Sequence, residues 1–427
     1  MSAQTLLKKI QDGAYDGALA ALYGTDNVAQ QRARYAGAVE GFAATFGGEG
    51  DLLLFSAPGR TEIGGNHTDH NYGRVLAGSV NLDVIAVVRP AAGLIRMLSE
   101  CYPIIEVDTA ELLPVESEKN GSASLIRGTA ARFADLDYAI GGFDAYATSN
   151  VLKGSGLSSS AAFEVLIGVI LNHLYNEGRV SPVEIAQIAQ YTENIYFGKP
   201  CGLMDQMASS VGNIITIDFA DPAQPIIEKV EVDFAATGHA LCIVDVGGDH
   251  ADLTHEYAAV PGEMKAVAAS LGVPVLRQTT MEALLANITD LRRQHGDRAV
   301  LRAIHFLQEN ERVLEQVAAL RAGDFEGFKK RIIASGNSSF QYLQNVYATG
   351  DVKEQSMSLA LALAQRLLEG AGAWRVHGGG FGGTTQNFVP LDKLEEFKTT
   401  IEQVFGAGSC HVLNIRPYGG VCVDKLV

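Results

Sequence analysis

The stretch KGSGLSSSAAFEVLIGVIL (residues 153–171) begins with glycines and serines and continues directly into an apolar pattern of helical period. A helix N-terminus offers unpaired N–H groups and a partial positive charge, and small residues let a phosphate approach that backbone. We therefore interpret the stretch as a phosphate-binding loop followed by a helix. Taken alone, such a loop more often only caps the helix, so the interpretation depends on its neighbours. The candidate loop residues are Gly154, Ser155, Gly156, Leu157, Ser158, Ser159 and Ser160.

A second polar loop, SAPGRTEIGGNHTDHN (residues 56–71), carries Arg, Glu, Asn, His and Asp side chains among three glycines. Each buried hydroxyl group of a ligand needs a hydrogen-bond partner, and this loop offers many. Its composition therefore favours recognition of a polyhydroxylated ligand over a plain solvated loop. His67 and His70 are poor candidates for a metal site, because no third ligand is apparent nearby.

Two further stretches carry candidate site residues. In GKPCGLMDQMAS (residues 198–209), Asp205 follows a glycine turn, and Glu193 lies twelve residues upstream. One carboxylate there can orient or deprotonate a hydroxyl nucleophile while a second holds Mg²⁺, although a lone Asp at such a place is more often a helix cap. The stretch HGGGFGGTTQ (residues 377–386) has five glycines, which suits a backbone that lies against a ligand or another domain.

The order of the expected elements favours an α+β fold. Residues 1–45 have helical periodicity, and β-rich runs bounded by Gly and Pro begin at about 52. Two helices are expected between about 156 and 197, and long amphipathic helices between 279 and 371. The glycines of 377–386 lie between two expected strands. Helices and strands form blocks and do not alternate regularly, which is typical of α+β proteins.

The composition excludes several classes of protein. The 427 residues include 33 Lys and Arg against 49 Asp and Glu, so the net charge of −16 argues against general binding of nucleic acid or an anionic membrane. The five cysteines are widely spaced, and neither a secretion signal nor a stretch of about 18 apolar residues occurs. We therefore expect a cytoplasmic protein with reduced thiols. Glycine is unusually frequent, with 46 residues.

Together the four stretches resemble the GHMP superfamily of small-molecule kinases, named for galactokinase, homoserine kinase, mevalonate kinase and phosphomevalonate kinase. The galactokinase branch is the most similar. Its motif Gly-Arg-Val-Asn-Leu-Ile-Gly-Glu-His-Thr-Asp-Tyr-Asn corresponds to residues 59–71, and Gly-Leu-Ser-Ser-Ser-Ala is intact at 156–161. Its Thr-Gly-X-Gly-Phe-Gly-Gly corresponds to 377–383, Pro-Cys-Gly-Ile-Met-Asp-Gln is nearly complete at 200–206, and its seven-residue His-to-Tyr spacing is kept from His250 to Tyr257.

The resemblance implies a two-domain fold with the active site between the domains. The first domain, over residues 1–230, would resemble the second domain of ribosomal protein S5, and the second, over 231–427, would be ferredoxin-like. The implied activity is transfer of a phosphoryl group from ATP to the C1 hydroxyl of galactose or a close derivative, with Mg²⁺ as the metal.

The resemblance also implies roles for single residues. Arg60 would be the catalytic arginine, and Asp205 the acid facing the C1 hydroxyl. Ser160 and Glu193 would hold Mg²⁺, while residues 154–160 would bind the phosphates. Whether Asp205 removes the proton or mainly orients the hydroxyl stays open at this point. The sugar contacts would come from Asn66, His67, Asp69, Gly202 and Tyr257.

Three departures from the family pattern lie on the sugar side. The Glu before the His, which contacts the C6 hydroxyl in the family, is Asn66, and the Tyr after the Asp is His70. The arginines usually found shortly after the position of Tyr257 are replaced at 260–263. Because an amide removes a negative charge and adds a donor, a kinase for a C6-modified sugar such as galacturonate is an alternative.

Two further classes of protein, a kinase for a different small molecule and a sugar sensor, fit the motifs less well. The His67-Thr68-Asp69 run is typical of sugar kinases, which argues against a mevalonate or homoserine kinase. Some galactokinase-like proteins are sugar sensors that have lost a Ser-Ala pair from the second motif. Residues 158–162 are complete here, and Arg60 and Asp205 are present, which argues against a sensor without catalysis.

Overall fold

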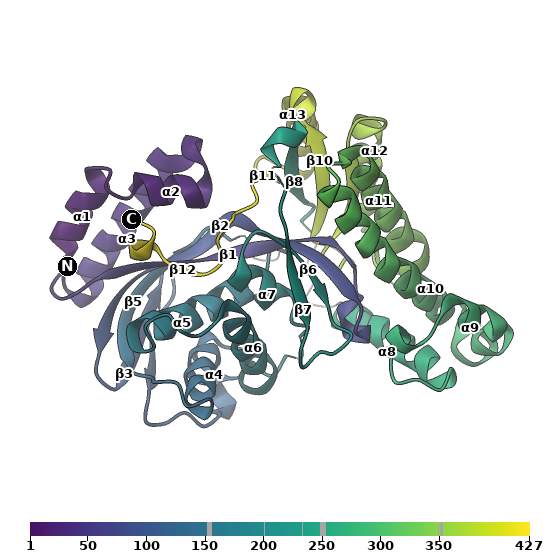
Figure 1. The fold of residues 1–427 in the computed structure, drawn as a ribbon. Coiled ribbons are helices and arrows are strands. Elements are labelled where there is room, and N and C mark those ends of the chain that lie inside the picture. Colours follow the sequence, from purple (N-terminus) through teal and green to yellow (C-terminus); the bar gives the residue numbers. More distant parts are fainter. Residues whose placement is uncertain (152–155, 200, 233, 248–252, 349, 351–352) are drawn as a thin grey trace.

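Two long strands, β1 (Leu53–Gly64) and β2 (Arg74–Ala91), form the centre of the larger of two β-sheets (Figure 1). The computed structural model describes residues 1–427 except 152–155, 200, 233, 248–252, 349 and 351–352. β2 has 18 residues, so its first half pairs with β6 (Ile214–Asp218) and its second half with β5 (Gly142–Ser149). The sheet is completed by β3 (Leu94–Ser99), β4 (Ile105–Asp108), β7 (Ile226–Val230) and β12 (Val421–Cys422), in the order β12-β1-β2-β5-β3-β4 with β6 and β7 beside β2.

The smaller sheet is antiparallel and has four strands in the order β11-β8-β10-β9. Its strands are β8 (His239–Asp245), β9 (Ala373–His377), β10 (Thr384–Pro390) and β11 (Cys410–Leu413). Helices connect β8 to β9 and β10 to β11, so the chain follows the ferredoxin-like order that the resemblance implies. The glycine-rich stretch 378–383 is the connection between β9 and β10, as the sequence predicted.

The helices also follow the expected blocks. They are α1 (Ala3–Gln11), α2 (Asp16–Tyr23), α3 (Val28–Phe46), α4 (Ser122–Asp135), α5 (Ser159–Tyr175), α6 (Pro182–Thr192), α7 (Met204–Val211), α8 (Thr254–Ser270), α9 (Met281–Ala286), α10 (Ile288–Arg321), α11 (Phe325–Ser338), α12 (Ser356–Leu368) and α13 (Leu394–Phe405). Helix α6 begins with a capping box between Ser181 and Glu184, a pattern that a Ser-Pro start with Glu three residues after the Ser favours. No helix among these described residues is long and apolar enough to cross a membrane.

Helices cover both faces of the larger sheet. In Figure 1, α1 to α3 lie on one face and α4 to α7 on the other, and α10 and α11 contact β1 beside the smaller sheet. One continuous core includes Ile63 of β1, Val317 of α10 and Phe388 of β10. Apolar packing therefore joins the two sheets. The predicted division of the chain at 230 stays a prediction; β7 ends at Val230, and the C-terminal β12 returns to pair with β1.

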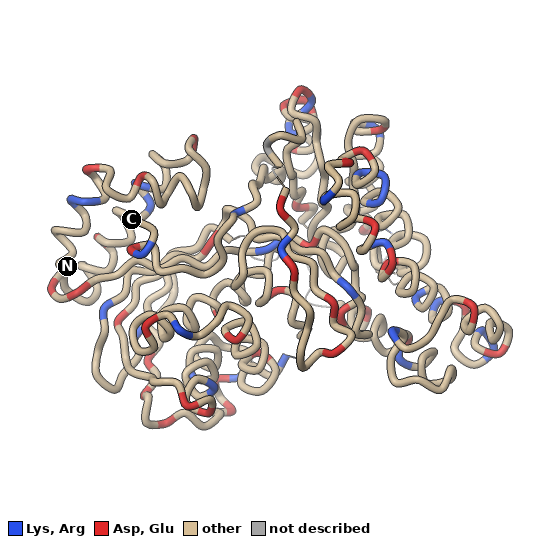
Figure 2. The backbone as a smooth tube through the Cα atoms, viewed as in Figure 1, with Lys and Arg blue, Asp and Glu red and all other residues tan. Residues whose placement is uncertain are grey.

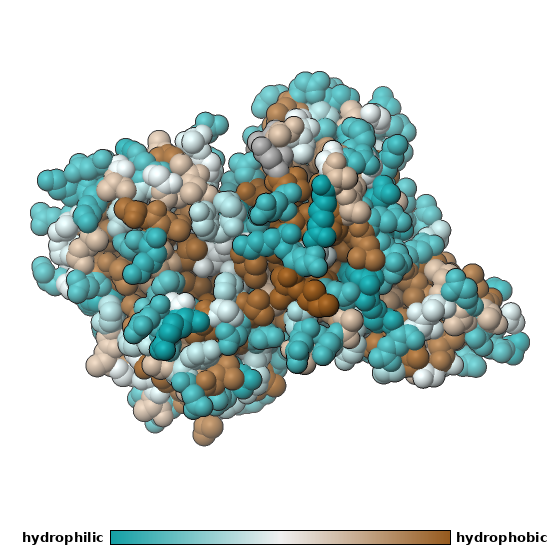
Figure 3. Space-filling model, in the orientation of Figure 1, coloured by the Kyte–Doolittle hydropathy of each residue, from teal (hydrophilic) through white to brown (hydrophobic). Residues whose placement is uncertain are grey.

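Charges of both signs are interspersed along the backbone in Figure 2. In the same orientation, the space-filling view shows hydrophilic residues around the periphery, while apolar residues gather near the middle, over β7 and β8 (Figure 3). Ile226 of β7 is among the exposed large hydrophobic residues.

A buried charge network fastens the N-terminal helices and the C-terminal segment to the larger sheet. The fully buried Asp83 of β2 accepts hydrogen bonds from Arg34 of α3 at 2.6 Å and from Arg416 at 2.9 Å. The hydroxyl groups of Tyr23 and Ser56 also donate to it. Burial alone would raise the pKa of Asp83, but Arg34, Arg416 and the two hydroxyl groups outweigh burial and lower it. The carboxylate is therefore charged and fully partnered.

We expect Asp83→Asn to lower the free energy of unfolding by about 3–5 kcal/mol, because it leaves two arginines without their shared carboxylate. Urea denaturation followed by circular dichroism measures the change. The matched control is Asp51→Asn, which removes an exposed partner of the N-terminal ammonium and should leave the urea midpoint unchanged. Equal losses in the two variants would contradict the assigned role of Asp83.

The same network predicts a pH dependence. The Asp83 carboxyl has a lower pKa in the folded chain than in the unfolded chain, where an Asp titrates at about 3.9. Its contribution to stability is therefore present above about pH 4 and is lost as the pH falls through the folded-state pKa. The free energy of unfolding, measured by urea denaturation at several pH values between 6 and 3, should fall more steeply with decreasing pH for the wild type than for Asp83→Asn.

Candidate active site

An ion pair between Arg60 and Asp205 joins the two predicted catalytic residues of the stretches 56–71 and 198–209. Arg60 lies on β1, and Asp205 lies in the first turn of α7. The Nε and Nη2 atoms of Arg60 each donate to one Asp205 oxygen at 2.7 Å, which is the bidentate geometry of a strong pair. Arg60 also donates to the carbonyl of Gly156. The two predicted catalytic residues therefore meet at the glycine-rich loop.

The described part of that loop lies directly on β1. The backbone N–H of Arg60 donates to the Leu157 carbonyl at 3.0 Å, and Gly156 has a φ of +68°, which favours glycine. Ser158 is also left-handed, and its hydroxyl donates to Asp205 without capping α5. Ser159 and Ser160 open that helix. Gly154 and Ser155 lie outside the described residues.

Ser158 stands at the N-cap position of α5, but its side chain does not cap the helix. A left-handed, non-glycine residue is costly in conformational energy and occurs often at functional sites. Because Ser158 does not cap α5, it leaves the first N–H groups of this helix without a side-chain partner from that position. Such groups can bind an anion.

Asp205 is held as a carboxylate. Burial alone would raise its pKa, but Arg60 opposes burial with its charge and hydrogen bonds, Ser158 adds a further bond, and the resulting pKa lies below the ordinary value. The side chain still keeps 31% of its surface exposed, compared with 7% for Arg60. Asp205 is therefore unprotonated before a ligand binds, and a ligand hydroxyl can reach its charged oxygen. Such an oxygen can accept a hydrogen bond from that hydroxyl and orient it.

Glu193 lies on a π-helix, η4 (Glu193–Phe197), that follows α6. Single turns of π-helix are frequent at functional sites. The Nε2 atom of Gln206 donates to Glu193 at 2.7 Å and to Glu164 of α5 at 3.2 Å. Lys199 lies 3.7 Å from the second oxygen of Glu193. Two carboxyl groups therefore converge on one amide beside Asp205.

Burial and the nearby Glu193 raise the pKa of Glu164 well above its ordinary value. One of its oxygen atoms is buried and has no hydrogen-bond partner in the described part of the chain. Glu164 and Gln206 are not among the predicted site residues. The available signals were the four-residue spacing of Glu164 from Ser160, which places both on one face of α5, and the position of Gln206 next to Asp205.

The site has few protein ligands for a metal ion. Within the described ranges, no group of three or more His, Cys, Asp or Glu side chains is arranged to hold one. The oxygen atoms of Glu193 and Ser160 nevertheless suit Mg²⁺, which usually takes one or two protein ligands and completes its shell with water and phosphate. The residues therefore fit a cation that binds together with phosphates, and not a cage made of protein ligands alone.

The sugar-side candidates Asp69 and Gly202 are in direct contact. A Cβ atom on Gly202 would lie 1.9 Å from Oδ2 of Asp69, so only glycine permits this approach. Gly202 lies three residues before Asp205, and the contact therefore brings the loop of residues 65–71 beside the Arg60–Asp205 pair. Asp69 and His67 both keep part of their surface exposed. Burial lowers the pKa of His67 to about 4, so its imidazole is neutral at pH 7.

The glycine-rich connection between β9 and β10 (residues 378–383) packs against the loop of residues 65–71. His67 contacts the Gly379 carbonyl at 2.9 Å through Nε2, and the Tyr257 hydroxyl donates to the Gly380 carbonyl at 2.7 Å. A Cβ atom on Gly379 would lie 2.3 Å from the Tyr257 ring, whose edge packs on Phe381. The structure therefore brings His67 and Tyr257 together through this connection.

Asn66 lies deeper than the other sugar-side candidates. Its side chain is fully buried, and its Nδ2 atom donates to Glu62 at 3.0 Å and to the Gly378 carbonyl at 2.7 Å. Its Oδ1 atom accepts from Ser339 and Asn345. The amide is thus satisfied within the protein, and direct contact between Asn66 and a sugar stays a prediction.

His377 replaces the threonine that begins the family's third motif, and it joins the two sheets. Its Nε2 atom accepts from the N–H of Glu62 at 3.2 Å, and Nδ1 lies 2.9 Å from the Thr384 hydroxyl. Burial, together with the charges of Arg60 and Arg375, lowers its pKa well below the ordinary value. His377 is therefore a neutral, buried link. Its place at the motif was visible in the sequence, but its partners were not.

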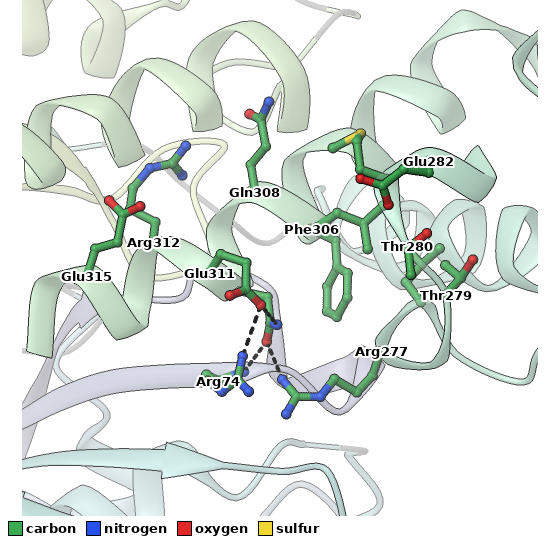
Figure 4. A pocket seen from close by; sticks show the side chains of 14 residues that line it. Arg74, Arg277, Thr279, Thr280, Glu282, Phe306, Gln308, Glu311, Arg312 and Glu315 are labelled. Atoms are coloured by element: carbon green, nitrogen blue, oxygen red, sulfur yellow. Dashed lines mark hydrogen bonds and ion pairs between the residues drawn. The ribbon is translucent and has the colours of Figure 1, made fainter. Parts of the chain in front are cut away.

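A cavity of about 690 Å³ lies elsewhere, along α10 (Figure 4). None of the predicted site residues lines it. The lining arginines Arg74 and Arg277 share the carboxylate of Asp218, each at 2.8 Å, and Arg277 also donates to Asn310. Arg74 also pairs with Glu311 at 3.2 Å, so two carboxylates balance the two arginines within the protein.

Two family models match segments of the chain that contain strands and helices of the larger sheet. Residues 124–213 match the family model "GHMP kinases N terminal domain", and residues 40–90 match "Galactokinase galactose-binding signature". The chain is 31% identical to a galactokinase of Streptomyces coelicolor over 86% of this chain and 92% of that protein. It is also 31% identical to a galactokinase of Actinobacillus pleuropneumoniae, over 81% of this chain and 87% of that one.

Solved structures of galactokinase and mevalonate kinase have a similar fold. Lactococcus lactis galactokinase in complex with galactose matches with a TM-score of 0.78 and 26% identity, over 91% of this chain and 100% of that one. Methanococcus jannaschii mevalonate kinase shares the fold with a TM-score of 0.62 at 13% identity, over 86% of this chain and 99% of that one. With its motifs brought together around Arg60 and Asp205, the chain belongs to the galactokinase family of the GHMP kinases.

Proposed function

We propose that this protein is an ATP-dependent sugar kinase that phosphorylates the C1 hydroxyl of galactose. The observation that carries the proposal is the Arg60–Asp205 pair, which lies between the serine-rich start of α5 and the Asp69–Gly202 contact. A phosphoryl donor on one side and a sugar on the other would both reach this pair. The identity to galactokinases over most of both chains supports the choice of galactose.

In the proposed reaction, the C1 oxygen forms a bond to the γ-phosphorus of ATP while the bond to the β–γ bridging oxygen breaks and ADP leaves. Asp205 accepts a hydrogen bond from the C1 hydroxyl, orients it, and receives its proton as the new bond forms. Arg60 offsets the negative charge of Asp205 and of the transferring group. Such a loose transition state needs positioning and charge stabilisation more than a strong base.

The backbone at the start of α5 would bind the phosphates through the N–H groups that Ser158 leaves uncapped. Mg²⁺ would be held by Glu193 and Ser160, and when bound it supplies positive charge that neutralises the phosphate oxygens. Gln206 keeps Glu193 in place through its 2.7 Å hydrogen bond. On the sugar side, we propose contacts from His67, Asp69, Gly202 and Tyr257. The cytoplasmic location and the absence of nucleic acid partners stay predictions.

A panel of sugars tests the substrate. We expect the highest kcat/KM for galactose among galactose, galacturonate, galactosamine and N-acetylgalactosamine, measured by coupled detection of ADP. A higher kcat/KM for galacturonate would favour the kinase for a C6-modified sugar. Binding of galactose and ATP without turnover would instead indicate a sensor.

We expect Asp205→Asn to lower kcat by about 10²–10⁴-fold while the affinity for ATP stays within about threefold, because the variant keeps the shape but loses the charge and the proton acceptor. Steady-state kinetics and ATP titration measure the two effects. The matched comparison is Asp69→Asn, which removes a sugar contact and should raise KM for the sugar more than it lowers kcat. A kcat of Asp205→Asn close to that of the wild type would overturn the assignment.

We expect Glu193→Gln to raise the Mg²⁺ concentration needed for half-maximal ATP binding by about tenfold or more, because the variant removes a charged ligand. Fluorescence titration of a labelled ATP analogue at increasing Mg²⁺ measures this without turnover. The control Glu228→Gln removes an exposed partner of Arg321 and should change nothing. An unchanged Mg²⁺ dependence in Glu193→Gln would exclude Glu193 as a ligand.

A further inference from the structure

Glu62 and Asn66 form a buried pair beneath the sugar loop. They are four residues apart, and Nδ2 of Asn66 donates to Oε1 of Glu62 at 3.0 Å. Asn66 is 0% exposed and Glu62 is 3% exposed. The reaction proposed above uses neither side chain, although both lie within the motif that carries Arg60 and Asp69.

The family motif places these two chemical groups in the opposite order. In Gly-Arg-Val-Asn-Leu-Ile-Gly-Glu-His-Thr-Asp-Tyr-Asn, the amide aligns with position 62 and the carboxylate with position 66. This chain has the carboxylate at 62 and the amide at 66. The departure at Asn66 is therefore accompanied by the reverse departure at its hydrogen-bond partner, and the pair keeps one carboxylate and one amide.

The carboxylate of Glu62 has a buried counter-ion. Arg375 of β9 is 0% exposed, and it donates to Oε1 of Glu62 at 2.5 Å and to the Ile63 carbonyl at 2.6 Å. Burial raises the pKa of Glu62, and the charges of Arg375 and Arg60 oppose this shift. A buried charge is tolerated when it is paired, and the cluster therefore pairs one carboxylate with one guanidinium. A second carboxylate would leave an excess negative charge, and no carboxylate would leave an excess positive charge.

The remaining partners of Asn66 require an amide at that position as long as Glu62 is present. The Nδ2 atom also donates to the Gly378 carbonyl, and a carboxylate there would place two acceptors against each other. Oδ1 accepts from Asn345 at 2.8 Å and from Ser339 at 3.1 Å. Ser339 begins a π-helix, η7 (Ser339–Leu343), after α11. Asn66 therefore joins the sugar loop to the β9–β10 connection and to the end of α11.

We propose that Glu62 and Asn66 are an exchanged pair of positioning residues, in which the carboxylate that the family carries at 66 is supplied from 62. The pair holds residues 65–71 against 378–383, so that His67 and Asp69 keep the place in which a sugar meets them. The exchange keeps the charge of the cluster balanced, so that the loop holds its place for galactose, although the buried Glu62 does not itself take over the C6 contact of the family's Glu. The last step rests on the proposed function.

A double-mutant cycle tests the exchange. Counting Arg375, the buried charge of the cluster is zero in the wild type, positive in Glu62→Asn, negative in Asn66→Glu, and zero again in the double variant. We expect each single substitution to lower Tm by about 5 °C or more. The double variant should lose clearly less than the sum of the two single losses, because its charge is balanced again although the Gly378 carbonyl still faces a carboxylate. Thermal unfolding without ligands measures this coupling independently of any activity.

Kinetics with galactose give the functional half of the test. We expect each single variant to raise KM for galactose by about tenfold or more with kcat within about threefold, because the loop moves while Arg60 and Asp205 stay in place. The double variant should return KM to within about threefold of the wild type. An Asn66→Glu variant that alone improves kcat/KM for galactose would overturn the proposal, as would additive losses of Tm in the double variant.

Poor folding and a wrong substrate remain distinguishable in this design. If a single variant yields no folded protein while the double variant folds, the exchange is supported, and failure of the double variant to fold overturns it. If the wild type phosphorylates none of the sugars, the proposed function fails, but the coupling in Tm still decides whether the pair is exchanged. Glu62→Gln, which removes the charge at constant length, should behave like Glu62→Asn if charge is the cause.

Discussion

The Arg60–Asp205 ion pair is the interaction on which the active site depends. Arg60 is 7% exposed and would pay a desolvation penalty without a counter-charge, so two hydrogen bonds of 2.7 Å to Asp205 tie the positions of β1 and α7 to each other. The same arginine reaches the Gly156 carbonyl, and Ser158 donates to the same aspartate. One half-buried pair thus sets where the glycine-rich loop, the central strand β1 and the start of α7 meet.

Two glycines allow close contacts beside that pair, where the sugar is proposed to bind. Gly202 lets the carboxylate of Asp69 lie against the backbone of the segment that leads to Asp205, and Gly379 accepts the ring of Tyr257. A side chain at Gly202 would collide with the Asp69 carboxylate, and one at Gly379 would collide with the Tyr257 ring. The frequent glycines at the site are thus explained by contacts in which the backbone of one segment lies against a side chain of another.

Much of this arrangement could be predicted from local sequence patterns. The strand, glycine loop and strand at 373–390, the capping box of α6 and the helical run after Ser158 depend on residues close together in the chain, and the structure contains all of them. The family motifs also identified Arg60 and Asp205. The sequence did not predict that Ser158 bonds Asp205 and leaves the helix uncapped, because this contact depends on a residue 47 positions away.

The sequence by itself predicted the glycine-rich loop before α5 and the α+β class, because spacing and periodicity are local properties of the chain. The ferredoxin-like order of the smaller sheet and the roles of Arg60 and Asp205 came from the resemblance to the family. The tertiary structure alone decided which groups are partners. It places Glu62 between Asn66 and Arg375, and Gln206 between Glu164 and Glu193. A residue such as Asn66 therefore looks like a loss of charge in the sequence, whereas the structure shows that it bonds the nearby Glu62, whose charge is paired with Arg375 more than 300 residues away along the chain.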